Sequence, residues 1–216
     1  MSYHRIAQTI FCKQLTKYSA MLYSFALCQN LLAITVSLSS HDVSITSWEM
    51  VKTYLEDTNI EPGHISELHM SDFNITYMPS WIVEQKPNLK ILGLDNNALY
   101  TLPDNICHLK NLEHLFLDCN NLRSLPASLS HLNNLLYISS SHNRLSSIPP
   151  QFASIPKLKS LNLSGNPIIS LPDTFTRLTN QIFCLGMRGT NLRKHNKENT
   201  LRQETLQNLF ANKMLL

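Results

Sequence analysis

The residues of this chain whose types and spacing could support chemistry are two histidines, a cysteine and two aspartates. His142 follows Cys119 by 23 residues, Asp118 follows Asp95 by the same interval, and His114 stands five residues before Cys119. A cysteine near histidines is typical of metal sites and of thiol nucleophiles, and paired carboxylates are typical of acid–base catalysis. No third residue that would orient the cysteine and a histidine is evident. The two aspartates favour contact with basic residues of a partner over acid–base catalysis.

The interval of 23 residues belongs to a sequence repeat that covers residues 89–180. Each block has Leu or Ile at positions 4, 11 and 14, Asn at position 9 and Pro at position 15. Weaker copies begin at Ile65 and Ile182, which gives about six repeats. The four clear blocks begin at Leu89, Leu112, Leu135 and Leu158.

The pattern within one block predicts a strand followed by a turn and a short helical return. Positions 4 and 6 alternate with polar residues, which is the period of a strand, and the Asn at position 9 can hydrogen-bond the backbone of a bend. Apolar residues at positions 18 and 21, after the Leu-Pro pair, favour a helical or 3₁₀ turn. One block cannot bury its own apolar face. Stacked blocks therefore predict an α/β solenoid with a parallel, concave sheet and end caps.

Positions 3, 5, 7 and 8 flank the buried strand residues and are predicted to face the concave surface, because strand side chains alternate. Phe116 and Tyr137 should be neighbours on adjacent strands, where aromatic side chains on a small, polar face are candidate anchors. The alternative is that Phe116 only packs on its neighbours. The residues predicted to bind a partner are His69, Ile91, Asp95, His114, Phe116, Asp118, Tyr137, His142 and Arg188.

Composition narrows the classes of function. The formal net charge of +3 is too small for a strong nucleic-acid or lipid interaction. The five cysteines are scattered and lack C-x-x-C spacing, which favours a reducing compartment or a bacterial origin. No phosphate-binding glycine loop, zinc spacing or hydrolase motif occurs, so no cofactor or metal is expected.

The two flanks of the array are predicted to be caps. Residues 1–64 should form a helical N-terminal cap, in which Thr46 and Glu49 make a capping box. Residues 18–40 carry no charge, and they favour either a packed cap helix or a membrane or export segment. Residues 193–216 predict an amphipathic helix that is a second cap or a recognition tail.

The blocks resemble the 23-residue, Leu-Pro-containing class of intracellular leucine-rich repeats found in Ras-suppressor-type proteins. They are also similar to repeat effectors that pathogenic bacteria deliver into host cells. The resemblance covers about residues 65–192 and implies a protein-binding scaffold whose concave face grips one partner. We expect the chain to be a non-enzymatic monomer. Bacterial ubiquitin-ligase effectors with such arrays add a large catalytic domain, and residues 193–216 are too short for one.

Three functions remain open from the sequence. The first is an intracellular protein-interaction module, which could also act as an effector exported into a host cell. The second is a membrane-anchored binding protein held by residues 18–40. The third is an enzyme that uses His114, Cys119 and His142, for which the spacing is weak support.

Overall fold

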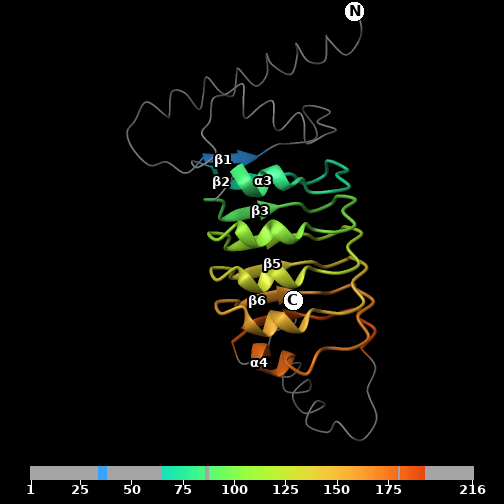
Figure 1. Ribbon diagram of the computed structural model, residues 1–216. Coiled ribbons are helices and arrows are strands. Elements are labelled where there is room, and N and C mark those ends of the chain that lie inside the picture. The colour runs from blue at the N-terminus through green and yellow to red at the C-terminus, as the bar shows by residue number, and fades with distance from the viewer. Residues whose placement is uncertain (1–33, 38–64, 86–87, 180, 193–216) are drawn as a thin grey trace, which may run out of the picture.

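A computed structural model describes residues 34–37, 65–85, 88–179 and 181–192. Strands alternate along the chain with short helical turns (Figure 1). The strands are β1 (Ile34–Ser37), β2 (Ile65–His69), β3 (Ile91–Gly93), β4 (His114–Phe116), β5 (Tyr137–Ser139), β6 (Ser160–Asn162) and β7 (Cys184–Gly186). The helical turns are α3 (Ser80–Gln85), η2 (Asp104–His108), η3 (Ala127–His131), η4 (Pro150–Ser154) and α4 (Phe175–Thr179).

The strands form a single parallel sheet in chain order, from β1 to β7. The register joins equivalent repeat positions, so that Leu92 pairs with Leu115 and Leu115 pairs with Ile138. Each of the six predicted repeats contributes one strand, β2 to β7. The predicted solenoid with a parallel sheet is therefore confirmed.

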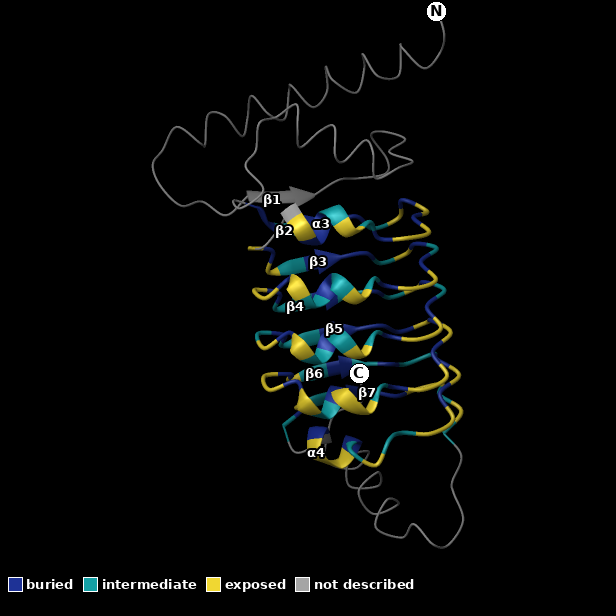
Figure 2. Cartoon of the chain, viewed as in Figure 1, coloured by how far each residue is buried: buried dark blue, intermediate teal, exposed yellow. Residues whose placement is uncertain are grey.

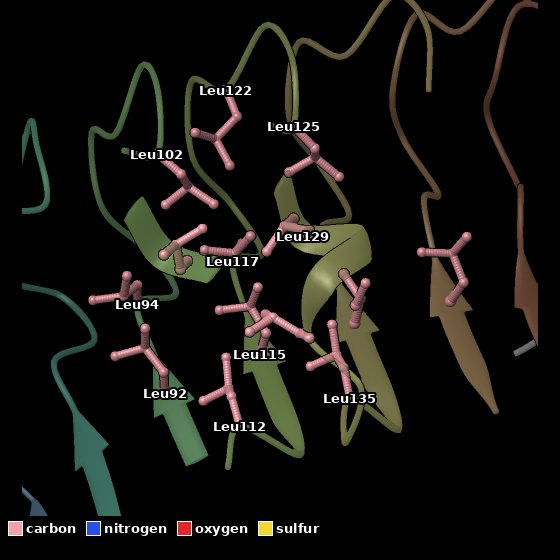
Figure 3. Close-up of a cluster of buried hydrophobic side chains, with 14 of the residues drawn as sticks. Leu92, Leu94, Leu102, Leu112, Leu115, Leu117, Leu122, Leu125, Leu129 and Leu135 are labelled. Carbon is pink, nitrogen blue, oxygen red and sulfur yellow. The ribbon is translucent and has the colours of Figure 1, made fainter. Parts of the chain in front are cut away.

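A continuous leucine core lies between the sheet and the helical turns (Figures 2 and 3). Leu92, Leu115 and Leu117 are fully buried, as is Leu129 from the helical turn η3. Burial of each such side chain contributes roughly 1.5–3 kcal/mol. We call the opposite surface of the sheet, which carries repeat positions 3, 5, 7 and 8, the concave face.

The asparagines at repeat position 9 form a buried ladder that joins successive repeats. Asn120 donates from Nδ2 to the carbonyl oxygens of Leu94 and Leu117, at 2.9 and 3.1 Å. Its Oδ1 accepts the backbone N–H of Leu99 at 3.0 Å. Each asparagine thus hydrogen-bonds backbone groups in the turn of the preceding repeat as well as in its own turn. The first repeat has Phe73 at this position, and Asn97 of the second repeat accepts the N–H of Phe73 at 3.1 Å.

The proline at position 15 precedes each 3₁₀ turn, as predicted. Pro103, Pro126 and Pro149 have φ between −71 and −58° and are the N-caps of η2, η3 and η4. Proline suits this site because it lacks the N–H that the first turn would leave unpaired. The turns direct Ile106, Leu129 and Phe152 into the core.

The strand β1 differs from the sequence prediction. Its residues 34–37 lie in the uncharged segment 18–40, for which a cap helix or a membrane segment was expected. They instead pair in parallel with β2, with Ile34 beside Ile65. The sequence Ile-Thr-Val-Ser contains three β-branched residues, which favour a strand. Among the described residues, no helix has the length and apolar character needed to cross a membrane.

The remaining predictions for the flanks concern residues 1–33, 38–64 and 193–216, which lie outside the described residues. The capping box of Thr46 and Glu49 and the amphipathic C-terminal helix remain predictions.

Candidate functional site

Three rings from adjacent strands meet on the concave face. His114 and Phe116 lie on β4, and Tyr137 lies opposite His114 on β5. The ring centroids of Phe116 and Tyr137 are 5.3 Å apart and the rings are tilted by 45°. His114 lies 6.2 Å from Phe116 and 6.1 Å from Tyr137. We call these three residues the aromatic cluster.

The rings of the aromatic cluster pack on one another and still reach solvent. His114, Phe116 and Tyr137 are each half-buried, whereas Leu115, between His114 and Phe116 on the core side of β4, is fully buried. The predicted adjacency of Phe116 and Tyr137 is thus present in the structure. Tilted aromatic pairs at this separation are worth about 0.5–1.5 kcal/mol beyond their buried area, so the cluster is a preformed surface.

Asp118 lies next to the cluster, and other residues of the sheet occupy its carboxylate. The hydroxyl of Ser139 lies 2.7 Å from both carboxylate oxygens of Asp118 and donates one hydrogen bond that the two oxygens share. Ser141 donates to Oδ1 through its backbone N–H at 2.6 Å and through its hydroxyl at 2.8 Å. Asp118 therefore has a structural role that its residue type did not reveal.

Asp95 is the neighbour of Asp118 on the preceding repeat and is less fully bonded. It accepts the backbone N–H of Asp118 at 3.1 Å and a longer bond from the hydroxyl of Ser71 at 3.4 Å. Burial raises the pKa of Asp95, and the charge of Asp118 raises it further, while the bond from the Asp118 N–H lowers it. Asp95 is thus a carboxylate with spare acceptor capacity and an unfavourable charged form.

The other predicted site residues lie around this centre. Ile91 is half-buried on β3 and pairs with His114 of β4. His69 on β2 lies 3.7 Å from Glu67, and its ring covers Gly93, where an added Cβ would be 2.9 Å from Nδ1. The structure therefore gathers the central residues of the predicted set on β3 to β5.

His142 and Arg188 lie farther along the face. His142 follows β5, and its ring covers Gly165 of the next repeat. Arg188 follows β7 and is exposed. Neither residue makes a ring contact with the aromatic cluster among the contacts that the described residues show.

The backbone at repeat position 8 has a left-handed conformation, which sequence reasoning missed. Cys119 and His142 have φ of 55° and 52°, and the same is true at this position of every described repeat. Left-handed φ is favoured by Gly, Asn and Asp. The other four residues are of those types, a signal that could have predicted the turn: Asp72, Asn96, Gly165 and Gly189.

The surroundings of Cys119 do not activate its thiol. Partial desolvation raises the pKa of Cys119, and the charges of Asp118, Asp95 and Asp72 raise it further. A thiol nucleophile requires the opposite shift, because the thiolate is the reactive form. Over the described ranges, no group of three or more His, Cys, Asp or Glu residues is arranged to hold a metal ion.

Comparison with family models identifies the repeats. Residues 87–145 match a model described as "Leucine rich repeat", and residues 157–178 match a second model of the same description. The matched segments are therefore leucine-rich repeats, as the resemblance implied. Domains of this kind are generally protein-binding modules and typically lack catalytic activity. A comparison with curated proteins found no match.

Solved structures with the same fold include a bacterial protein and two plant receptors. A leucine-rich repeat protein of Leptospira interrogans is 30% identical with a TM-score of 0.61, over 74% of this chain and 37% of that chain. The ectodomain of the Arabidopsis thaliana receptor kinase GASSHO1/SCHENGEN3, in complex with CASPARIAN STRIP INTEGRITY FACTOR 2, is 29% identical with a TM-score of 0.54. The plant peptide hormone receptor RGFR1, in complex with RGF2, is 28% identical with a TM-score of 0.54.

The matched part of each plant receptor is a small share of its length. Both matches cover 60% of this chain, but only 16% of the GASSHO1/SCHENGEN3 chain and 21% of the RGFR1 chain. This chain thus spans well under two thirds of each of the three solved proteins.

Proposed function

We propose that this protein is a non-enzymatic interaction module that binds one protein partner on its concave face, with the aromatic cluster as the anchor. The observation that carries the proposal is the contact of three half-buried rings on adjacent strands, at 5.3–6.2 Å between centroids. Large aromatic side chains dominate the energy of protein interfaces because they bury much area at low cost in conformational entropy.

The surface beyond the cluster suits a partner that approaches closely. Ser160 and Asn162 on β6, and Gly186 on β7, occupy the positions that Tyr137 and Phe116 occupy on their strands. The cluster therefore forms a raised edge beside a lower surface of small and polar residues. Complexes of two plant receptors of this fold, one with RGF2 and one with CASPARIAN STRIP INTEGRITY FACTOR 2, support a ligand-binding role.

We further propose that the module acts inside a cell, either in the cytoplasm where it is made or in a host cell that receives it as an effector. The three cysteines of the described residues support a reducing compartment: Cys107, Cys119 and Cys184 are all free thiols.

Affinity capture from a eukaryotic cell lysate tests the proposal. The test variant is the double substitution Phe116→Ser, Tyr137→Ser, because serine occurs at these positions in the chain's own repeats, as Ser139 and Ser160. The control is Tyr100→Ser, Ile169→Ser, which removes two large apolar side chains that are 53% and 50% exposed outside the concave face.

We expect the wild type and the control to retain the same partner and the cluster variant to lose it. All three proteins must first show the same thermal unfolding. A partner retained equally by all three would contradict the concave-face proposal.

A further inference from the structure

We infer that the partner inserts an arginine side chain at the aromatic cluster, where the guanidinium stacks on the rings and pairs with the carboxylate of Asp95. This inference rests on the proposed function, since it specifies the chemistry of the protein segment that the concave face binds. It is carried by the distribution of charge, by the position of the rings and by the bonding of the two aspartates.

The concave face is acidic, although the whole chain has a formal net charge of +3. Of the described residues at positions 3, 5, 7 and 8, four are carboxylates and one, Arg188, is a lysine or arginine. Among these carboxylates only Glu67 has an ion-pair partner within the described ranges, which is His69 at 3.7 Å. The four carboxylates are Glu67, Asp72, Asp95 and Asp118.

The carboxylates adjoin the rings. Asp118 lies two residues beyond Phe116, and the hydroxyl that holds it comes from Ser139, the residue paired with Phe116 across the strands. Asp95 lies two residues beyond Gly93, which pairs with Phe116 on its other side. Neighbouring strands lie about 4.8 Å apart and rise about 3.3 Å per residue, so diagonal neighbours of this kind are about 8 Å apart, within reach of one long side chain. An arginine on the rings could therefore reach the Asp95 carboxylate.

The two aspartates differ in what they can offer to such an arginine. Three donors from Ser139 and Ser141 occupy Oδ1 of Asp118, and the Ser139 hydroxyl also contacts Oδ2, so Asp118 contributes its charge and has less acceptor capacity left than Asp95. Asp95 accepts only one close bond, from the Asp118 N–H at 3.1 Å, and keeps lone pairs for a donor from outside. Burial is the main cause of the raised pKa of Asp95, and repulsion by the negative charge of Asp118 adds to it. A cation bound between the rings and Asp95 would relieve this repulsion.

Arginine fits these features better than the other candidate groups do. Its planar guanidinium stacks on aromatic faces and donates two parallel bonds to a carboxylate, whereas the lysine ammonium is a compact and strongly hydrated charge. An apolar partner would bury Asp95 without a counter-charge, which is costly. An acidic partner would be repelled by the four carboxylates.

A random heptapeptide display library, selected on the wild-type protein, tests the inference. Bound phage are sorted into those that still bind the Phe116→Ser variant and those that do not. The peptides that require Phe116 are then tested for binding to two further variants. Asp95→Asn removes the charge but keeps an acceptor for the Asp118 N–H. Asp104→Asn is the matched control, because Asp104 is an exposed carboxylate in η2 outside the concave face.

We expect arginine to be enriched among the peptides that depend on Phe116. Replacement of that arginine by citrulline, which keeps its shape without its charge, should weaken binding about tenfold, as should Asp95→Asn, while Asp104→Asn should have no effect. Peptides that depend on Phe116 but lack a basic residue, or that bind Asp95→Asn as well as wild type, would overturn the inference and leave the proposed function intact. The absence of any peptide dependent on Phe116 would overturn both.

Discussion

The carboxylate of Asp95 accepts the backbone N–H of Asp118 at 3.1 Å, and the carboxylate of Asp118 accepts the N–H of Ser141 at 2.6 Å. Each aspartate thus joins the end of its own strand to the same point on the next repeat. The bond needs an acceptor oxygen but no charge, because the donor is a neutral amide. A substitution can therefore remove the charge of Asp95 and keep its hydrogen bond to the Asp118 N–H.

The substitution Asp95→Asn should stabilise the protein slightly at neutral pH. Burial and the nearby charge of Asp118 raise the pKa of Asp95, so the folded state holds the proton more tightly than the unfolded chain does. Stability is then lost as the pH rises from the ordinary aspartate value of about 3.9 through the raised pKa. Asparagine avoids this loss and retains the acceptor. Urea unfolding of both proteins at pH 7 and pH 3 measures the effect.

The gain from Asp95→Asn should shrink toward zero at pH 3, where the aspartate is protonated in both states. The control is Asp95→Ala, which removes the acceptor as well and should cost about 1 kcal/mol relative to asparagine at either pH. A wild type more stable than Asp95→Asn at pH 7 would show that the charge of Asp95 is favourable in the folded protein.

The substitution Asn120→Ala should destabilise the solenoid by about 2–4 kcal/mol. It removes donors to the carbonyls of Leu94 and Leu117 and the acceptor for the Leu99 N–H, all of them buried. Asn120→Asp should be at least as damaging, because a carboxylate cannot donate to those carbonyls. The measurement is the free energy of unfolding in urea.

Asn133→Ala is the control for the ladder, because Asn133 is an exposed asparagine of the same array. It should change stability by less than about 0.5 kcal/mol. Equal effects at positions 120 and 133 would show that the ladder bonds contribute little to the fold.

The period of the repeat explains why the sequence predicted so much of the concave face. A period of 23 residues fixes the register of neighbouring strands, so the adjacency of Phe116 and Tyr137 follows without knowledge of any contact. The bonding of Asp118 could not be predicted in the same way. Its donors, Ser139 and Ser141, are serines of the next repeat, and that residue type does not distinguish an internal bond from a free hydroxyl.

Two further features were missed from the sequence. The strand β1 consists of four residues outside the repeats, within a segment whose lack of charge also suits a helix. The left-handed turn is marked by Asp, Asn or Gly in four of the six described repeats, whereas Cys119 is a residue type that seldom adopts that conformation. There the neighbouring repeats, rather than the local residue, determine the backbone.

The paired substitutions Gly165→Ala and Gly189→Ala should separate backbone strain from steric contact. Both glycines have left-handed φ, of 69° and 67°. A Cβ at Gly165 would lie 2.7 Å from Nδ1 of His142, whereas at Gly189 the nearest atoms are 3.7 Å away. Gly189→Ala should cost about 1 kcal/mol from strain alone, and Gly165→Ala should cost more because the ring of His142 must also move. Thermal unfolding of the two variants measures the difference.

A double-mutant cycle isolates the steric part of that difference. Addition of His142→Ala should reduce the cost of Gly165→Ala to that of Gly189→Ala, because the strain remains and the clash is removed. A cost of Gly165→Ala that is unchanged by loss of the His142 ring would contradict the observed contact.

Alkylation of Cys119 by iodoacetamide at pH 7.5 should be slower than that of an unstructured cysteine peptide, although Cys119 is exposed. Desolvation and the charges of Asp118, Asp95 and Asp72 raise the pKa of its thiol, and only the thiolate reacts. The substitution Asp72→Asn should speed the reaction, as should 1 M salt, which screens charges beyond about 3 Å. Residue-specific rates come from mass spectrometry of digested samples, with Cys107 and Cys184 as internal references. A rate above that of the free peptide would require a group that stabilises the thiolate. That result would favour the hypothesis of an enzyme that uses His114, Cys119 and His142.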